Sequence, residues 1–382
     1  MPTNSFGTMM LSVLKSLAVP LLLVVFPTAY LVVVSSHTAT GQPGHLLAVG
    51  PMLELRASHT ATVLQDGKVL IAGGFKKGPD GHSQIYSQSA ELFDPKTRKF
   101  TATKNMNVAR SGHTATLLAD GRVLIAGGVN SEGLTASAEV YDPSRGAFIP
   151  VATMSVGREG FTATRLLNGD VLLAGGGDRT ATASAELFHA GTNKFSSTGS
   201  MSVPRAAHTA TLLKNGRVLI AGGVNNRIVF ASTELYDPAA GTFSISGKMN
   251  VPRYKHAAIL LRDGHTLILG GSDAEDWRGE YRSAEIYDAK SERFTVIPDM
   301  LNPRFKFPGA VVELNTGSIL ICGGSKAIEI FDFFTKRFEY VASFSEPHYY
   351  STASSLKGHS VLIVGGYTDA VQATTDAWLY EE

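Results

Sequence analysis

The chain has 382 residues, of which 44% are hydrophobic and 18% charged, and its formal net charge is +1 at pH 7. A nearly neutral chain lacks the clustered positive charge of a broad nucleic-acid-binding surface, which excludes that class of protein. The single cysteine, Cys322, excludes an internal disulfide framework and a cysteine-rich metal cluster.

The first predicted element is an uncharged apolar run over residues 17–34, preceded by Lys15 and followed by small polar residues. This order is typical of an export signal. The run also reaches the lower length limit of a membrane span, although Pro20 and Pro27 interrupt it. We therefore expect residues 1–39 to be an export signal or an N-terminal membrane anchor with a short linker. The protein would then be extracellular, periplasmic or anchored in the membrane.

Seven Gly-Gly pairs divide the rest of the chain into repeats. Successive pairs lie 42 to 54 residues apart, close to the period of about 50 residues for a four-stranded propeller blade. Each repeat shows four strand signals in the same order, which we name a to d. Strand a mixes Thr, Ala and Leu, and strand b is a continuous apolar run that suits a strand buried on both faces. Strand c is similar to Ser-Ala-Glu-Leu-Tyr-Asp-Pro, and strand d runs from an aromatic residue to a methionine.

Asp-Gly or Asn-Gly joins strands a and b in five repeats, as at Asn215-Gly216. These dipeptides accept positive φ at both central turn positions, so the sequence predicts a tight two-residue hairpin. The small side chains of strand a indicate that it lies innermost, where wedge-shaped blades converge on an axis.

The two ends of the repeat region complement each other. The seventh repeat ends after its strand c, and residues 45–52 have the form of an isolated strand d. Pairing the two leaves no open sheet edge. The sequence therefore predicts an all-β fold over residues 40–382, a seven-bladed β-propeller whose last blade is closed by an N-terminal strand.

A Gly-Gly pair after an apolar strand, an aromatic-Asp-Pro sequence and a later aromatic residue at fixed spacing resemble kelch repeats. The resemblance covers about residues 45–382. It implies that the d–a and b–c loops gather on one face around the central channel. It also makes the chain similar to the central propeller of galactose oxidase. Kelch propellers include binding scaffolds and enzymes, so the resemblance implies no single activity.

An arginine follows each strand-d methionine by four residues, and a histidine takes this position in the seventh repeat. If strand a is innermost, these side chains form a ring at the channel entrance, where guanidinium groups could hold carboxylates, sulfates or phosphates. Alternatively, each arginine ties neighbouring blades together or pairs with a repeated glutamate such as Glu91. The candidate ligand-binding ring comprises Arg56, Arg110, Arg158, Arg205, Arg253, Arg304 and His348.

Histidines follow four of the arginines by three residues: His59, His113, His208 and His256. Four imidazoles at one level suggest a metal ring, but strands on opposite sides of a channel lie too far apart to share one ion at about 2 Å. We therefore expect hydrogen-bonded histidines that cap the inner strands, and we predict no metal or other cofactor.

Two b–c loops depart from the repeat, and such departures are candidates for function. The loop of the fifth repeat, residues 272–282, places Trp277 and Tyr281 among carboxylates and arginines, a combination suited to stacking on and hydrogen-bonding a sugar or a peptide. The first repeat has a long loop over residues 75–88. We expect both loops on the face of the arginine ring, unless they are simply surface insertions.

The similarity to galactose oxidase raises the alternative of an oxidase. That copper enzyme requires a cysteine cross-linked to a tyrosine, with tyrosine and histidine ligands. Cys322 instead occupies the strand-b column filled elsewhere by Ala72, Ala126 and Ala221, so we expect it to be buried in mid-blade, without a copper centre. Some kelch-type sugar mutarotases use an arginine and a glutamate in the channel mouth, but no particular pair is singled out here.

The sequence therefore favours an exported or membrane-anchored kelch propeller that acts as a binding module for a protein or a carbohydrate. The expected ligand is a glycan or an acidic peptide on the face formed by the d–a and b–c loops. The alternatives are a carbohydrate-active enzyme, mutarotase-like or oxidase-like, that uses the same pocket, and a purely structural envelope protein.

Overall fold

The computed structural model describes residues 44–177, 180–276 and 279–382. The chain divides into two units, Met1–Thr40 and Gly41–Glu382, and the described residues belong to the second. All of the named elements, β1 to β34, are strands. Within the described ranges no helix is long and apolar enough to cross a membrane. The expected signal or anchor at residues 17–34 lies outside the described residues.

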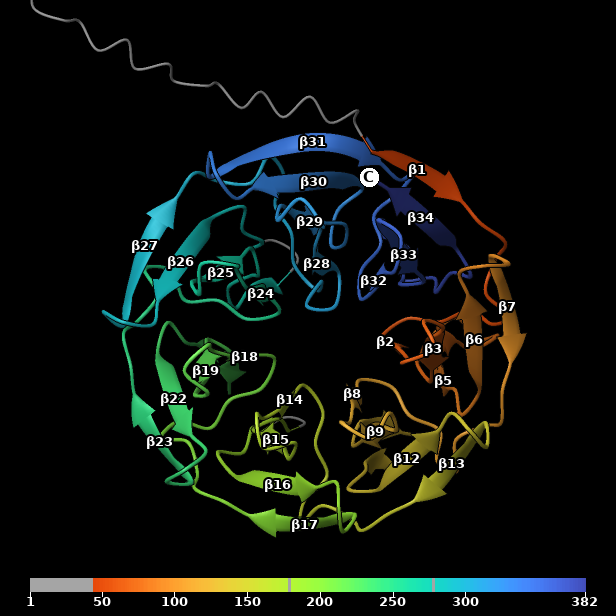
Figure 1. The fold of residues 1–382 in the computed structure, drawn as a ribbon, viewed down its shortest axis with the longest axis horizontal. Coiled ribbons are helices and arrows are strands. Elements are labelled where there is room, and N and C mark those ends of the chain that lie inside the picture. Colours follow the sequence, from red (N-terminus) through yellow and green to blue (C-terminus); the bar gives the residue numbers. More distant parts are fainter. Residues whose placement is uncertain (1–43, 178–179, 277–278) are drawn as a thin grey trace, which may run out of the picture. The chain divides into compact units, whose positions relative to one another are not determined.

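Seven four-stranded antiparallel sheets surround a central axis, one per blade, and the expected seven-bladed, all-β architecture is confirmed (Figure 1). The innermost strands, in blade order, are β2 (Thr60–Val63), β8 (Thr114–Leu117), β14 (Thr162–Arg165), β18 (Thr209–Leu212), β24 (Ala257–Leu260), β28 (Val311–Glu313) and β32 (Thr352–Leu356). The second strands are β3 (Val69–Ala72), β9 (Val123–Ala126), β15 (Val171–Ala174), β19 (Val218–Ala221), β25 (Thr266–Leu269), β29 (Ile319–Ile321) and β33 (Ser360–Val364).

The third and fourth strands complete each blade towards its outer edge. The third strands are β6 (Ala90–Asp94), β12 (Ala138–Asp142), β16 (Ala185–His189), β22 (Thr233–Asp237), β26 (Ala284–Asp288), β30 (Ala327–Asp332) and β34 (Ala377–Glu381). The outermost strands are β7 (Lys99–Ala102), β13 (Ala147–Pro150), β17 (Lys194–Ser197), β23 (Thr242–Ile245), β27 (Arg293–Ile297), β31 (Arg337–Ser343) and β1 (His45–Ala48). Three b–c loops form hairpins of their own: β4 (Phe75–Lys77) with β5 (Gln84–Tyr86), β10 (Val129–Asn130) with β11 (Gly133–Leu134), and β20 (Val224–Asn225) with β21 (Ile228–Val229).

The N-terminal strand closes the last blade, as predicted. β1 pairs antiparallel with β34, placing Leu46 opposite Tyr380 and Ala48 opposite Trp378. The strand is shorter than the predicted segment, since β1 ends at Ala48 and the buried Met52 lies beyond it. The other strand-d methionines also lie beyond their strands. Met106, for example, packs with buried aliphatic residues of the first and second blades, so these methionines fill the space between blades.

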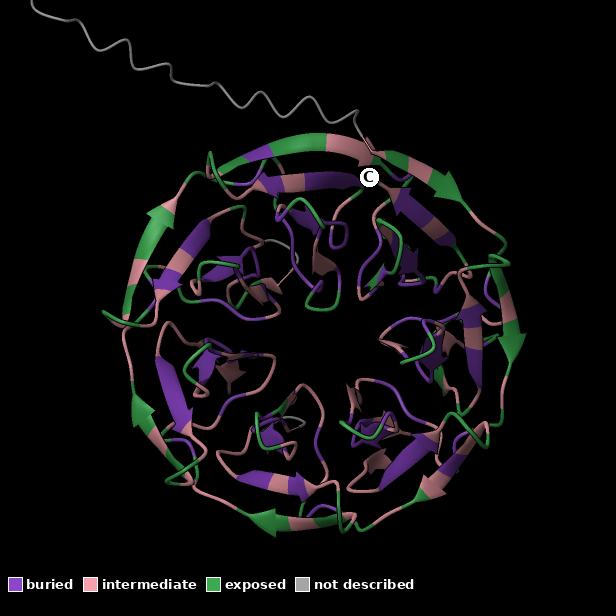
Figure 2. Cartoon of the chain, in the orientation of Figure 1, coloured by how far each residue is buried: buried purple, intermediate pink, exposed green. Residues whose placement is uncertain are grey.

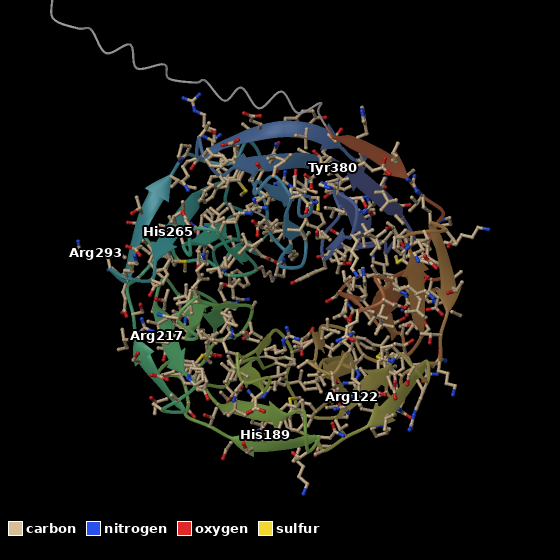
Figure 3. The ribbon with its side chains drawn as sticks, viewed as in Figure 1. Arg122, His189, Arg217, His265, Arg293 and Tyr380 are labelled. Atoms are coloured by element: carbon tan, nitrogen blue, oxygen red, sulfur yellow. The ribbon has the colours of Figure 1, made fainter. Side chains whose placement is uncertain are left out.

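From the second strand outwards, burial falls towards the outer edge of each blade, whereas the innermost strands are mostly of intermediate exposure (Figure 2). Every residue of β9 and β19 is buried, whereas β7 and β23 are largely exposed. Arg293, on the outermost strand β27, points away from the axis (Figure 3). This gradient explains why strand b is continuously apolar and why strand d mixes polar and apolar residues.

The turn between strands a and b differs from the predicted two-residue hairpin. In the fourth blade Gly216 has a φ of 83°, whereas Asn215 is outside the left-handed region. The Gly216 N–H donates to the carbonyl of Leu213, and the Leu213 N–H donates to the carbonyl of Arg217. The turn therefore closes at the glycine, which then occupies a left-handed bulge position. The prediction of positive φ at both central positions was wrong.

Candidate functional site

The repeat arginines lie between blades, as Arg110 shows. Its backbone N–H donates to the carbonyl of Ser87, and its own carbonyl accepts from Gly74; both partners belong to the first blade. Its guanidinium donates to the carbonyl of Gly127 and to the carboxylate of Glu139, in the second blade. Arg110 thus ties two neighbouring blades together.

All six arginines form the same buried ion pair and are at most 1% exposed. The pairs, with N–O distances of 2.9 to 3.1 Å, are Arg56–Glu91, Arg110–Glu139, Arg158–Glu186, Arg205–Glu234, Arg253–Glu285 and Arg304–Glu329. Burial lowers the pKa of Arg205, and the charge of Glu234 opposes this shift. These ion pairs agree with the alternative that the arginines tie neighbouring blades together and pair with the repeated glutamates. Because the six side chains are buried, we remove them from the candidate ligand-binding site.

The Gly-Gly pairs are explained by the same contact. A Cβ atom on Gly73 would lie 2.6 Å from the Arg110 carbonyl oxygen, and both Gly73 and Gly74 have positive φ. Only glycine combines this backbone conformation with such a close approach of the next blade. The pair is therefore a packing requirement of the blade interface.

His348 replaces the arginine in the seventh blade, and Trp378 replaces the glutamate. The two rings lie 4.8 Å apart between centroids, and Phe344 packs against both. His348 is fully buried, and burial lowers its pKa. An aromatic contact thus replaces the ion pair in this blade, and His348 also leaves the candidate site.

The repeat histidines link neighbouring inner strands. Nε2 of His113 lies 2.9 Å from Oγ1 of Thr60, which belongs to the preceding blade. The other three histidines make the equivalent contact. For His59, in the first blade, the partner is Thr352 of the seventh blade. Burial lowers the pKa of His208 to about 3, so its imidazole is neutral at physiological pH. These contacts agree with our expectation that the four histidines form hydrogen bonds at the inner strands.

A ring of seven left-handed residues surrounds the axis, one from each d–a loop. Their φ angles range from 51° to 62°. Six backbone hydrogen bonds connect successive members, as from Lys306 N–H to the Lys255 carbonyl. The ring comprises Ser58, Gly112, Gly160, Ala207, Lys255, Lys306 and Tyr350. We call it the mouth ring. Its small members come from the first four blades and its large ones from the last three, which makes it asymmetric.

The mouth ring lines a cavity of about 560 Å³. Aromatic rings of Phe75, Tyr254, Tyr350 and Tyr367 form part of the wall, and Gln84 and several hydroxyl groups also line it. A second cavity of about 280 Å³ shares part of this lining and continues along β14, β18 and β24. The residues labelled in Figure 3, among them Arg122 and Arg217, lie in the ring of blades and do not line this cavity. Ligand pockets typically have volumes of about 300 to 1,000 Å³.

Charged side chains lie together on one side of the mouth. Asp276 in the b–c loop of the fifth blade pairs with Lys255 at 2.9 Å and with Lys306 at 3.4 Å. The hydroxyl of Tyr254 donates to the same carboxylate. Lys306 is only 5% exposed, and burial together with the charge of Lys255 lowers its pKa to about 8. The Lys306 ammonium also lies 4.5 Å from the centroid of the Phe305 ring. We call Lys255, Asp276 and Lys306 the mouth cluster.

The two departing loops contribute to the mouth through residues other than those predicted. Trp277 lies outside the described residues. Tyr281 is half-buried with its ring 5.7 Å from the Arg253 guanidinium, and it does not line the cavity. Phe75 and Gln84 of the first loop do line it. Both loops therefore reach the face of the d–a loops.

Sequence reasoning missed the mouth ring and the mouth cluster. The available signal was variation: the second residue after the repeat arginine or His348 is Ser, Gly, Gly, Ala, Lys, Lys and Tyr in successive blades, whereas the arginine position itself largely repeats. A position that is free to vary inside a fixed scaffold is where a site can differentiate. The contact of Asp276 with the two lysines could not be seen in the sequence.

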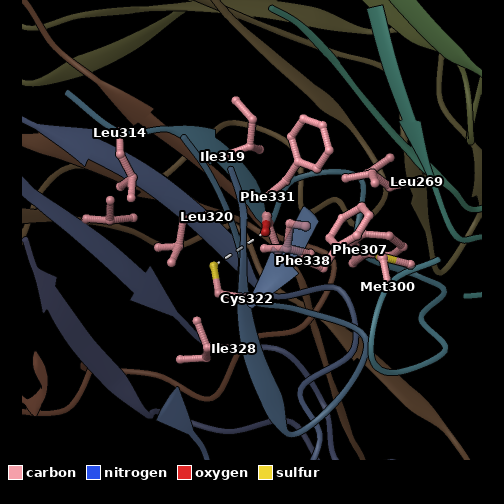
Figure 4. Packing of buried hydrophobic residues seen from close by; sticks show 14 of the residues in the cluster. Leu269, Met300, Phe307, Leu314, Ile319, Leu320, Cys322, Ile328, Phe331 and Phe338 are labelled. Atoms are coloured by element: carbon pink, nitrogen blue, oxygen red, sulfur yellow. Dashed lines mark hydrogen bonds between the residues drawn. The ribbon is translucent and has the colours of Figure 1, made fainter. Parts of the chain in front are cut away.

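Cys322 is buried among aliphatic and aromatic side chains, as expected (Figure 4). Its thiol contacts the carbonyl of Ala310, and burial raises its pKa to about 12. No group of three or more His, Cys, Asp or Glu side chains in the described part of the chain could hold a metal ion. The described residues therefore do not fit a cysteine–tyrosine copper centre.

Seven four-stranded blades with a lined cavity at one channel mouth define this protein as a seven-bladed β-propeller. The kelch motif matches residues 109–155. Because the features of that segment recur in phase through the blades, the chain is a kelch-repeat propeller.

Among solved structures, a fungal alcohol oxidase of the AA5 family, in complex with copper, is similar with a TM-score of 0.71 and 16% identity, over 89% of this chain and 76% of that chain. At this identity the likeness concerns the fold alone. No curated protein matches the sequence.

Proposed function

We propose that this protein is a carbohydrate-binding module whose ligand occupies the cavity at the mouth ring. The supporting observation is the lining: the rings of Tyr254, Tyr350 and Tyr367 stand beside charged and hydroxyl groups in a cavity of about 560 Å³. Aromatic side chains offer flat apolar faces, and the polar groups fix orientation. A sugar presents both an apolar ring face and many hydroxyl groups, so its chemistry matches this wall.

The charge distribution favours a glycan over an acidic peptide. Such a peptide presents several carboxylates to a cluster of arginines, and the six repeat arginines are buried in ion pairs. The lysines of the mouth face the carboxylate of Asp276, and Glu159 also lines the cavity. Asp369 is close by, accepting from the hydroxyl of Tyr349. Among the residues that the structure describes here, the carboxylates of Asp276 and Glu159 match the two lysines in number, which suits a run of ligand carboxylates poorly.

Filling the cavity from the mouth ring tests the proposal. Ala207 lines the cavity at the position that Tyr350 occupies in the seventh blade, and both have a φ near 50°. The backbone there accepts a tyrosine, so Ala207→Tyr should fold and occupy the pocket. In calorimetric titrations of the full chain with a panel of neutral and acidic oligosaccharides, we expect at least one ligand, with affinity reduced at least about tenfold in this variant.

Ala102→Tyr is the matched control, because Ala102 is exposed on the outermost strand β7. It should leave binding unchanged. Equal binding by both variants would place the ligand elsewhere, and no binding to any sugar by the full chain would refute the proposed function.

We also propose that the protein is exported or anchored in a membrane. The support is the sequence of residues 17–34, an uncharged apolar run that follows Lys15. Mass spectrometry of the N-terminal peptide in membrane and secreted fractions distinguishes a cleaved signal from a retained anchor. A full-length chain found only in the cytosol would contradict both.

A further inference from the structure

The mouth cluster contains two ammonium groups and one carboxylate. Both lysines are members of the mouth ring and come from adjacent blades, and both contact the carboxylate of Asp276, at 2.9 and 3.4 Å. Counted by themselves, these three side chains carry a net charge of +1. Like charges held close together repel each other, and a further anion beside them relieves the repulsion.

The surroundings of the cluster strengthen this effect. The Lys306 side chain is 6% exposed and that of Lys255 is 19% exposed. The rings of Phe305 and Tyr367 lie 4.5 and 5.9 Å from the Lys306 ammonium. Water therefore screens these charges poorly, so a ligand carboxylate beside them would interact more strongly than at an exposed site. Burial, and after it the charge of Lys255, lowers the pKa of Lys306.

The cluster also lies at one side of the cavity. Lys255 and Lys306 both line the cavity, and they come from the d–a loops that enter the fifth and sixth blades. Glu159 lines it too, from the loop that enters the third blade. A ligand with a carboxylate beside the two lysines and hydroxyl groups towards Glu159 would match both sides of the cavity. A glycan with a carboxylate on one of its sugar units has this distribution of charge.

We propose that the mouth cluster is a receptor for a single sugar carboxylate, so that the preferred ligand is a glycan that contains a uronic acid. This inference rests on the proposed function and assigns the chemical class of its ligand. In this receptor, Lys255 and Lys306 donate hydrogen bonds to the ligand carboxylate. Asp276 holds the two ammonium groups at a separation that fits this carboxylate.

The test uses pairs of tetrasaccharides that differ only at C6 of one terminal sugar unit: galacturonate and galactose, glucuronate and glucose, mannuronate and mannose. Each is titrated into the full chain by calorimetry. We expect the acidic member of at least one pair to bind at least about tenfold more tightly than its neutral partner. Equal binding of the neutral and acidic members in every pair that binds overturns this inference and leaves the carbohydrate-binding function standing. No binding in any pair refutes both.

Four variants assign the preference to the cluster. Lys306→Met and Lys255→Met should each bring the acidic-to-neutral affinity ratio towards one, and Lys306→Arg should retain it. Asp276→Asn removes the competing carboxylate and should raise the ratio, an outcome that a purely structural role for Asp276 does not produce. Circular dichroism verifies each fold, and the more exposed Lys255 provides a second variant if Lys306→Met fails to fold. A ratio that none of these variants changes overturns the assignment.

The pH dependence offers an independent readout. Among the described residues, the groups that face the Lys306 ammonium include Lys255, Asp276 and the rings of Phe305 and Tyr367. Buried tyrosine hydroxyls such as that of Tyr367 have raised pKa values, and the pKa of Asp276 is lowered, so neither changes charge near neutrality. The preference for the acidic sugar should therefore decline as pH rises through about 8, where Lys306 loses its proton. A preference that is constant up to about pH 10, the ordinary range of lysine, contradicts the role of Lys306.

Discussion

Glu234 accepts from the guanidinium of Arg205 and from the backbone N–H of Ser202, and it is 2% exposed. Removing one partner of such a pair leaves the other charge desolvated and without compensation. Replacement of Glu234 by glutamine retains an acceptor but removes the charge. We expect Glu234→Gln to lower the free energy of unfolding by about 3 to 5 kcal/mol, as measured by urea denaturation.

The exposed pair Arg98–Glu381 provides the comparison. Its N–O distance is 2.7 Å, shorter than that of the buried pair, but its side chains are 51% and 37% exposed. Because water screens this interaction, Glu381→Gln should cost at most about 1 kcal/mol. Equal effects of the two substitutions would show that the repeat arginines do not tie the blades together energetically.

At the scale of the element, β1 determines whether the last blade has an open edge. Its four residues pair with β34, and without them the edge of β34 would present unpaired backbone groups. A chain that starts at residue 49 keeps Met52 but lacks β1, and one that starts at residue 41 keeps both.

We expect the shorter chain to be less stable by about 3 kcal/mol, from a few ladder hydrogen bonds at about 1 kcal/mol each. It should also self-associate through the free edge, which analytical ultracentrifugation detects. Identical unfolding transitions for the two chains would mean that the closure by β1 contributes little to stability.

At the scale of the whole molecule, four histidines connect blades around the axis, and all four are buried. Burial lowers the pKa of His59 and His208 to about 3 and holds those of His113 and His256 well below the usual value. The unfolded chain takes up protons on these groups near pH 6.5, whereas the folded one does not. Stability should therefore be intact above about pH 6.5 and fall as the pH drops from there towards about 3, at up to about 1.4 kcal/mol per pH unit for each histidine.

His208→Phe isolates one of these contributions. Phe161 and Phe307 occupy the same position in the third and sixth blades, so the site accepts this ring. We measure urea denaturation between about pH 7 and about pH 5. The variant should lose less stability than the parent chain over this range, because its unfolded state takes up one proton fewer. The same pH slope in both chains would exclude His208 as a source of acid sensitivity.

Most of the architecture follows from local patterns in the sequence. The Gly-Gly period, the continuous apolar run of strand b and the isolated strand at residues 45–52 predicted seven blades and the way they close, because each signal acts within one or two neighbouring strands. The burial of Cys322 followed in the same way from the column of alanines in which it stands. The turn at Asn215-Gly216 was predicted wrongly. A two-residue hairpin and a turn that ends in a glycine bulge both favour a glycine here, so the residue type alone does not separate the two geometries.

The candidate site depended on tertiary structure. The sequence placed arginines near the channel, but it could not show that each one meets a glutamate of the next blade and so withdraws from the cavity. Lys306 and Asp276 are 30 residues apart in the chain, in neighbouring blades, and only the packing of these blades brings them within 3.4 Å. Repetition thus determined the scaffold from the sequence alone. The site arises where non-repeated residues of several blades converge on one axis, and that convergence is a property of the folded ring.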